Sequence, residues 1–200
     1  GACDMGALPG DFPGYQKVAN PDALAKFEKA WGVKLSPTPG LTIPDMMDAA
    51  VEGKLKAMYV LGEDPVMTDP DANHIKKALE AMDFVVVQEI FMSQTAKYAD
   101  VILPGATFAE KDGTFSNSER RVQRVRKAIE PIGDTKPDWK IICEVSSRMG
   151  YPMEYTHPEQ VFNEMAALTP SYGGINYERI EHKGLQWPCP TLDHPGTPIL

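Results

Sequence analysis

Three short apolar runs, separated by stretches that favour helix, constrain the fold of this chain more than any other feature. They cover residues 57–61, 84–88 and 100–103, and their apolar residues follow one another almost without interruption. Continuous rather than alternating apolar runs are typical of strands buried on both faces of a parallel sheet. The sequence therefore predicts an α/β fold: a Rossmann-like parallel sheet with helices on both faces, plus irregular N-terminal and C-terminal extensions.

Helix-start signals surround these runs. Asn20 precedes Pro21, and a proline at the first helical position after an asparagine N-cap is a common helix start. We expect helices at residues 20–31, 42–52, 71–82, 137–149 and 158–168, and a short helix or turn at 93–98. We divide the chain into an irregular and helical segment (1–56), a Rossmann-like nucleotide-binding domain (57–150), and a C-terminal helix with a Pro/Gly-rich tail (151–200).

Composition argues against several classes of protein. A net charge of −8 does not suit a general nucleic-acid binder, which would carry a basic face. No apolar run approaches the roughly 20 residues that a membrane-spanning helix needs, so we expect no membrane insertion. Cys3, Cys143 and Cys189 form no CxxC pair, which argues against a local zinc or iron–sulfur site and indicates a reducing compartment. We expect Cys143 to be a buried small hydrophobe, and we expect a cytoplasmic location, with the periplasm as the alternative.

The first residues are Gly-Ala-Cys-Asp-Met, with no initiator methionine, signal peptide or purification tag before them. We therefore expect the chain to be a piece of a longer polypeptide.

Polar residues stand where the first two apolar runs end, and ligands of open α/β sheets lie at the carboxyl ends of the strands. Glu89 takes the place at which an acid accepts hydrogen bonds from the two hydroxyls of a ribose. Two acids without a glycine-rich phosphate loop favour contacts to a sugar or base over contacts to phosphates. The candidate residues at these ends are Gly62, Glu63, Asp64, Thr68, Gln88 and Glu89.

Asp138, at the start of an expected helix, is a further candidate. A carboxylate accepts both adjacent N–H groups of a guanine edge, and the indole of Trp139 would pack on the base. The alternative is that Asp138 only N-caps its helix and that Trp139 belongs to the core. The sequence has neither GxGxxG nor GxxxxGK[ST], which argues against a standard NAD or P-loop site.

The basic run at 120–127 has two interpretations. It suits phosphate or nucleic-acid contact, and it equally suits a half-exposed strand in which Val122 and Val125 alternate with charged residues. We favour a strand that docks on another part of the parent protein, with an arginine close to a pyrophosphate. Before and within this run, we expect a polar loop that contains Thr114, Asn117, Glu119 and Arg120.

The other ionisable residues suggest binding rather than catalysis. The four histidines have no acidic or cysteine partner at ligand spacing, so we expect them to be surface residues. No Ser-His-Asp set, activated thiol or carboxylate dyad emerges. We therefore predict no catalytic residue and no metal ligand in this chain.

Several motifs resemble the catalytic (alpha) subunit of molybdopterin-dependent formate dehydrogenases, in the C-terminal part of the molybdopterin-binding region. ADVILP at 99–104 and the GTF-N-E-R-x-Q pattern at 113–123 are shared across the wider molybdopterin oxidoreductase family. GACDMG at 1–6 and EIFMSQTA at 89–96 point more narrowly to formate dehydrogenase. The other matching segments are 61–65 with Thr68, Asp138-Trp139, and Gln186-Trp187-Pro188-Cys189.

The resemblance implies oxidation of formate to carbon dioxide at molybdenum or tungsten held by two molybdopterin guanine dinucleotides. A [4Fe–4S] cluster in an N-terminal domain would take the electrons. The metal ligand, its histidine and the cluster cysteines would lie upstream, and a catalytic arginine just before Gly1, so the three cysteines are not expected in those roles. The implied partners are the remaining domains of the alpha subunit, electron-transfer subunits and formate. By itself the fragment is expected to be inactive, and whether it holds the cofactor alone stays open.

The resemblance also implies a set of cofactor-binding residues around one guanine dinucleotide in the domain at 57–150. One departure from the pattern is Arg120 after Glu119, where the family often has glycine, which puts close backbone approach there in doubt. Another molybdopterin oxidoreductase of the nitrate reductase kind, and a stand-alone nucleotide-binding or interaction module, remain alternatives. The implied residues are Gly62, Glu63, Asp64, Thr68, Gln88, Glu89, Ile90 and Asp138.

Overall fold

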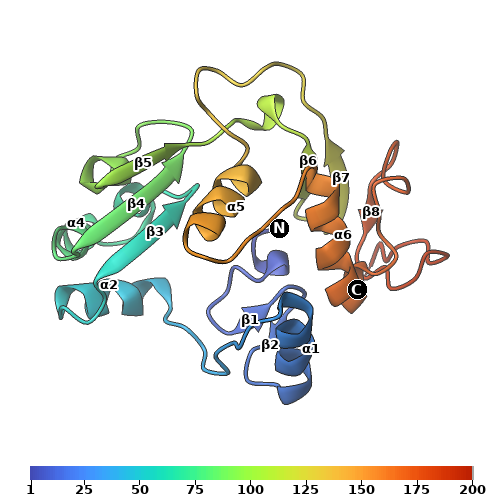
Figure 1. The fold of residues 1–200 in the computed structure, drawn as a ribbon, viewed down its shortest axis with the longest axis horizontal. Coiled ribbons are helices and arrows are strands. Elements are labelled where there is room, and N and C mark those ends of the chain that lie inside the picture. Colours follow the sequence, from blue (N-terminus) through green and yellow to red (C-terminus); the bar gives the residue numbers. More distant parts are fainter. Residues whose placement is uncertain (200) are drawn as a thin grey trace. The chain divides into compact units, whose positions relative to one another are not determined.

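The computed structural model describes residues 1–199 and resolves into two compact units (Figure 1). We call the first the sheet unit; it combines Leu41–Lys111 and Lys127–Glu154. We call the second the terminal unit; it combines Gly1–Gly40, Asp112–Arg126 and the described residues from Tyr155 onward. The three-segment division at residues 56 and 150 stays a prediction about the longer protein.

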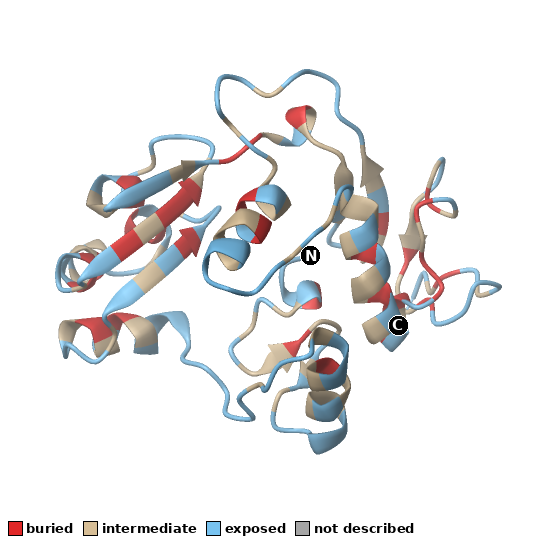
Figure 2. Cartoon of the chain, in the orientation of Figure 1, coloured by how far each residue is buried: buried red, intermediate tan, exposed pale blue. Residues whose placement is uncertain are grey.

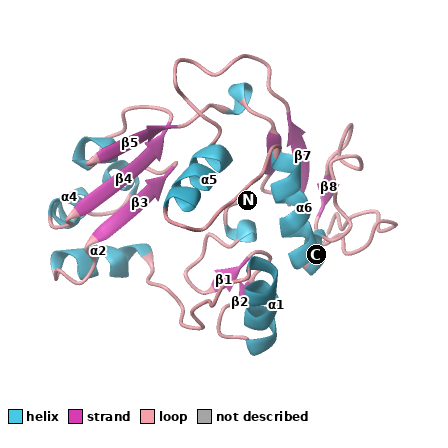
Figure 3. Cartoon of the chain, in the orientation of Figure 1, coloured by secondary structure: helices cyan, strands magenta, loops and turns pink. Residues whose placement is uncertain are grey.

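The sheet unit contains a three-stranded parallel sheet, which confirms the predicted α/β class (Figure 3). The strands follow their sequence order, β3-β4-β5, and each corresponds to one of the three apolar runs. Helices α3 and α4 lie between β3 and β4, and the 3-10 helix η2 lies between β4 and β5. The elements of this unit are α2 (Ile43–Val51), β3 (Ala57–Leu61), α3 (Pro65–Thr68), α4 (Ala72–Glu80), β4 (Phe84–Glu89), η2 (Thr95–Tyr98), β5 (Val101–Pro104), η3 (Phe108–Glu110) and α5 (Asp138–Arg148).

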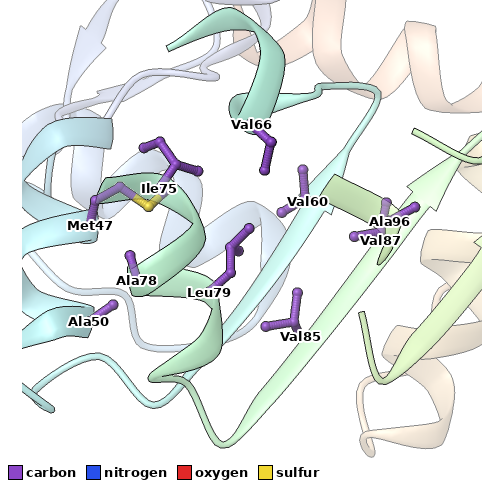
Figure 4. Packing of buried hydrophobic residues seen from close by; sticks show 10 residues of the cluster. All are labelled: Met47, Ala50, Val60, Val66, Ile75, Ala78, Leu79, Val85, Val87 and Ala96. Atoms are coloured by element: carbon purple, nitrogen blue, oxygen red, sulfur yellow. The ribbon is translucent and has the colours of Figure 1, made fainter. Parts of the chain in front are cut away.

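One face of this sheet carries the core (Figure 4). Val60, Val85 and Val87 are at most 6% exposed and pack against apolar side chains of α2 and α4. Side chains of a strand alternate between faces, so Tyr59 and Gln88 belong to the other face. There Tyr59 stays 40% exposed while Gln88 is buried, and Figure 2 shows the same mixture of burial along the strands. The start of α5 lies beside this second face, because Asp138 hydrogen-bonds Gln88.

The helix boundaries follow the predicted caps. Asn20 accepts hydrogen bonds from the N–H groups of Asp22 and Ala23, and Pro21 opens α1 (Pro21–Trp31). Thr42 forms a capping box at the start of α2, with its side chain and that of Asp45 each accepting from the other residue's N–H. Side chains that satisfy the unpaired N–H groups of a first turn stabilise a helix start by about 1 kcal/mol, which explains why these starts are readable from sequence.

The terminal unit contains a second, antiparallel sheet that sequence reasoning described only in part. Strands β6 (Gly113–Ser116) and β7 (Arg121–Val125) form a hairpin, and β8 (Leu185–Gln186) pairs with β7. The strand interpretation of the basic run is therefore confirmed, with Val122 buried. The polar-loop expectation was wrong for Thr114, which lies in β6. The remaining elements of this unit are η1 (Cys3–Met5), β1 (Asp11–Phe12), β2 (Gln16–Lys17), α1, α6 (Pro158–Leu168) and η4 (Pro170–Tyr172).

A buried carboxylate, Asp4, ties the ends of the terminal unit together. It is 5% exposed and accepts hydrogen bonds from the hydroxyl of Tyr15 (2.8 Å), the indole N–H of Trp187 (3.1 Å) and the hydroxyl of Tyr172 (3.3 Å). The hydrogen bond to Asp4 raises the pKa of Tyr15 from 10.0 to about 12. Because a buried charge is costly unless it is hydrogen-bonded, these three donors make Asp4 a fixed junction between segments far apart in sequence.

We predict that Asp4→Asn lowers the pKa of Tyr15 from about 12 toward 10.0. The amide removes the negative charge that disfavours tyrosinate. A titration of tyrosinate absorbance, assigned by comparison with Tyr15→Phe, measures the change. Asp22→Asn, on α1 of the same unit, should leave the titration unchanged. An unaltered Tyr15 pKa in Asp4→Asn would contradict this account of Asp4.

Candidate functional site

The carboxyl ends of the three parallel strands form one continuous edge. Leu61, Gln88 and Leu103 stand in one row of the register. Just beyond this row, the N–H of Gly62 donates to the carbonyl of Gln88 (3.0 Å), and the N–H of Gly105 donates to that of Glu89 (3.1 Å). We call this boundary the carboxyl edge. The predicted strand-end residues thus meet on one side of the sheet unit.

Asp64 holds the two loops of the carboxyl edge together. Its Oδ1 accepts from the N–H (2.9 Å) and hydroxyl (2.6 Å) of Thr95, and its Oδ2 accepts from the N–H of Gln94 (3.0 Å). Partial burial by itself would raise the pKa of Asp64, but these hydrogen bonds outweigh it and hold the pKa below its ordinary value of 3.8. Both carboxylate oxygens are engaged with the chain, so the structure gives Asp64 a role in joining β3 to η2.

Gln88 and Asp138 form a hydrogen-bonded pair at the same edge. Gln88 is 1% exposed, and its amide donates to Oδ1 of Asp138 (2.8 Å). The Tyr59 hydroxyl donates to the amide oxygen of Gln88, and the Lys111 ammonium donates to Oδ2 of Asp138. Burial raises the pKa of Tyr59, and the charge of Asp138 adds to this rise. Four side chains from four segments therefore form one polar network.

The N-cap alternative for Asp138 was wrong. The cap residue of α5 is Pro137, whose side chain makes no capping bond, and Asp138 is the first helical residue. The carboxylate of Asp138 therefore does not cap the helix and accepts a hydrogen bond from Gln88 instead. Trp139 is half-buried, and the ammonium of Lys140 lies 5.4 Å from its ring centroid.

The end of β5 brings Asp138 to this position. The chain before α5 pairs with β5 beyond its last residue: the N–H of Lys136 donates to the carbonyl of Pro104 (3.2 Å), and the N–H of Ala106 donates to that of Lys136 (2.8 Å). A Cβ on Gly105 would lie 3.0 Å from Oδ1 of Asp138, tighter than an ordinary contact. The missing side chain at Gly105 leaves room for the carboxylate.

The other predicted residues line the edge with less internal bonding. Glu63 is exposed, and the half-buried Glu89 accepts from the N–H of Ile90 (2.6 Å). The hydroxyl of Thr68 donates to the carbonyl of Asp64 (3.2 Å). Ile90 is 45% exposed and continues into Phe91 and Met92, which are 76% and 66% exposed. Ile90 is one of the residues implied by the family resemblance, but sequence reasoning missed Phe91 and Met92. It also missed Tyr59 and Lys111, because nothing in their local sequence shows that they join the network of Asp138.

The edge offers hydrogen-bond acceptors at Glu63, Glu89 and Asp138. Ionised carboxylates accept but do not donate, so they suit a ligand that presents hydroxyl and N–H groups, such as the ribose and base of a nucleoside. The helix that starts at this edge, α3, has only four residues, and Asp64 stands at its N-terminus. The negative charge of Asp64 would repel a phosphate there. The residues at the edge therefore fit the sugar and base of a nucleotide rather than its phosphates.

The basic run is bonded within the terminal unit. Arg120 donates to the carbonyl oxygens of Trp187 and Thr197. Arg124 and Arg126 both pair with Glu181, at 3.0 Å and 2.7 Å. These contacts support a structural role for the run, and an arginine contact to a pyrophosphate stays a prediction.

The described residues show no arrangement suited to a metal ion: within 1–199, no group of three or more His, Cys, Asp or Glu side chains is placed to hold one. Cys143 is 8% exposed, as expected of a buried small hydrophobe, and Cys189 is fully buried. No helix in the described part of the chain is long and apolar enough to cross a membrane.

Comparison with known proteins identifies the family to which the chain belongs. Residues 1–148 match the sequence model of the Molybdopterin oxidoreductase family, which is well over half of the chain. The chain belongs to the molybdopterin oxidoreductase family. Family membership implies a molybdopterin cofactor, and the carboxyl edge lies inside the matched residues.

Relatives in this family include formate dehydrogenase subunits. The F420-dependent formate dehydrogenase subunit alpha of Methanocaldococcus jannaschii is 50% identical over 202 residues, covering 100% of this chain and 30% of the relative. A putative formate dehydrogenase of Bacillus subtilis is 52% identical over 181 residues, covering 90% of this chain and 18% of the relative. The chain thus spans less than a third of either relative.

A solved structure supports the fold. Acetylene hydratase from Pelobacter acetylenicus superposes with a TM-score of 0.59 at 23% identity, over 81% of this chain and 23% of that chain. At this identity the likeness bears on the fold alone.

We predict that Asp64→Asn destabilises the protein by about 1–3 kcal/mol at neutral pH, because an amide nitrogen would face donors that now bind a charged acceptor. The folded-state pKa of Asp64 is lowered, so its contribution is complete above the unfolded pKa and is lost as the pH falls through the folded pKa. The difference from wild type should therefore shrink below about pH 4. Urea unfolding across this pH range measures it.

Glu63→Gln is the matched control for Asp64→Asn, because Glu63 is its exposed neighbour. We expect a change within about 0.5 kcal/mol. A difference for Asp64→Asn that did not depend on pH would contradict the proposed charge-assisted bonds.

Proposed function

We propose that this chain is the guanine-dinucleotide-binding part of a formate dehydrogenase alpha subunit, which in its full length oxidises formate to carbon dioxide. The observation that carries this proposal is the set of carboxylates at the carboxyl edge of a chain that is 50% identical throughout to an F420-dependent formate dehydrogenase subunit alpha. The cofactor would be a molybdopterin guanine dinucleotide carrying molybdenum or tungsten. When bound, that cofactor supplies the two-electron redox chemistry.

The residues of this chain would bind and orient the nucleoside end of the cofactor. Glu89 would accept hydrogen bonds from the ribose hydroxyls, as an acid after the second strand does in dinucleotide-binding folds. Asp138 would accept from the adjacent N–H groups of guanine, with Gln88 bonded behind it. Gly62 and Glu63 would form the adjoining wall, with Thr68 and Ile90 at its margin. Asp64 would not contact the ligand directly but would hold in place the two loops that form this part of the site.

The rest of the reaction would belong to other parts of the longer protein. We place the metal ligand and a [4Fe–4S] cluster in other parts of the longer protein, since no group of His, Cys, Asp or Glu side chains within the described residues is placed to hold a metal ion. Further domains of the alpha subunit and electron-transfer subunits would be its partners. We propose a cytoplasmic location.

The first test of this function is the activity of the full-length protein. Purified with molybdenum or tungsten, it should reduce an artificial electron acceptor when formate is added, and acid hydrolysis of its cofactor should release GMP. Activity with nitrate but not formate would instead indicate a nitrate reductase. Release of no guanine nucleotide would favour a stand-alone interaction module and overturn the proposal.

A second test addresses Glu89. Glu89→Gln should lose the cofactor about ten-fold faster, since a hydrogen bond to a charged acceptor contributes roughly 1.5–3 kcal/mol. The amide oxygen can still accept from Ile90, so the fold should be kept. GMP retained after dilution and gel filtration measures the loss.

The control for Glu89 is Glu80→Gln, the same change at an exposed residue of α4. It should retain the cofactor as wild type does. Equal retention by Glu89→Gln and wild type would remove Glu89 from the site.

A further inference from the structure

The geometry points to Lys111 as a positioning residue for the base-binding carboxylate of Asp138, and this inference rests on the function proposed above. Lys111 pairs with Oδ2 of Asp138, while Gln88 bonds Oδ1. In this role Lys111 acts through Asp138 and makes the site selective for a base with two adjacent N–H donors, which is guanine among the common purines.

Lys111 directly follows the 3-10 helix η3, which several hydrogen bonds hold in place. The preceding residue, Glu110, is 2% exposed, and its carboxylate accepts from the N–H groups of Thr107 (2.7 Å) and Ile132 (2.8 Å). The hydrogen bond from the Thr107 N–H holds the pKa of Glu110 below its ordinary value. The carbonyl of Ala109 accepts from the N–H groups at 128 and 129. The backbone at Lys111 is thereby joined to the chain that leads to α5.

The pair is sheltered from solvent. The side chain of Lys111 is 21% exposed and that of Asp138 is 34% exposed, so water screens their attraction less than it would on an open surface. Lys140 is close in sequence, but its ammonium lies over the ring of Trp139. Among the described residues, Lys111 is the cation whose contact with Asp138 the structure shows.

Two hydrogen bonds to the carboxylate of Asp138 limit its rotation and the number of further hydrogen bonds that it can accept. A carboxylate has about four acceptor positions, two on each oxygen. Gln88 and Lys111 occupy one position on each oxygen of Asp138, which leaves one on each for a ligand. Two parallel acceptors suit the N1–H and amino group of guanine, whereas adenine presents an acceptor at its N1 position. Lys111 also offsets the cost of covering an ionised carboxylate with a base.

The test uses the intact, cofactor-loaded protein and follows the loss of GMP-yielding cofactor after dilution. Lys111→Met should lose the cofactor about ten-fold faster than wild type, because one oxygen of Asp138 loses its partner. Lys140→Met is the matched control, with the same change of charge two residues from Asp138, and should behave as wild type. Lys111→Arg, which can still pair with a carboxylate, should restore most of the retention.

A double variant separates positioning from direct contact. If Lys111 acts through Asp138, then Lys111→Met combined with Asp138→Asn should lose the cofactor no faster than Asp138→Asn alone. Additive losses would show that Lys111 acts independently of Asp138, for example on a phosphate, and would overturn the inference. Wild-type retention in Lys111→Met would overturn it as well.

Two further outcomes distinguish this inference from the proposed function. If wild-type protein contains no guanine nucleotide, the proposed function fails and the inference falls with it. If wild type holds GMP-yielding cofactor but Asp138→Asn retains it fully, the function stands and the inference fails. Should Lys111→Met not accumulate as folded protein, Lys111→Gln keeps a polar side chain without the charge, and the same double-variant comparison applies.

Discussion

The register of the parallel sheet is the constraint on which the candidate site depends. With Leu61, Gln88 and Leu103 in one row, the loops after all three strands leave the sheet at the same boundary. A shift of one residue would turn Gln88 toward the helix-covered face and move Val87 out of the core, since side chains alternate along a strand. The buried valines of β3 and β4, which Figure 4 shows in the core, therefore fix the strand register. That register determines which polar side chains reach the carboxyl edge.

The acidic residues of the sheet unit fall into different groups according to the hydrogen bonds that their carboxylates accept. Asp64 and Glu110 are satisfied by N–H groups of their own unit, and their pKa values are lowered accordingly. They hold loops in place. Glu63 and Glu89 retain acceptor capacity toward the edge. Asp138 shares features of both groups. Its carboxylate is bonded to Gln88 and Lys111, and its side chain is still 34% exposed. This division separates the acids that stabilise the loops of the carboxyl edge from those that could accept hydrogen bonds from the proposed ligand.

Local signals in the sequence were enough to predict most of the elements. The apolar runs became β3, β4 and β5, and the caps at Asn20 and Thr42 begin the helices that they predicted. These features depend on neighbours within a few residues. The hairpin of β6 and β7 was recognised only through its second strand, since the first strand has four residues and a single large apolar side chain, Phe115. The exposed side chains of Phe91 and Met92 were missed because their exposure follows from tertiary packing.

The sequence by itself determined the fold class, the family and the strand-end positions of the candidate residues, because apolar periodicity, caps and motifs are written along the chain. Only the tertiary structure decided what each acid does. In the folded chain, Asp64 is hydrogen-bonded to Thr95, and Asp138 does not cap its helix. Lys111 and Tyr59 join the hydrogen-bond network of Gln88 and Asp138. The hydrogen bonds of this network join residues up to 50 positions apart, from Gln88 to Asp138. Contacts over such separations depend on strand register and loop packing, which no local pattern encodes.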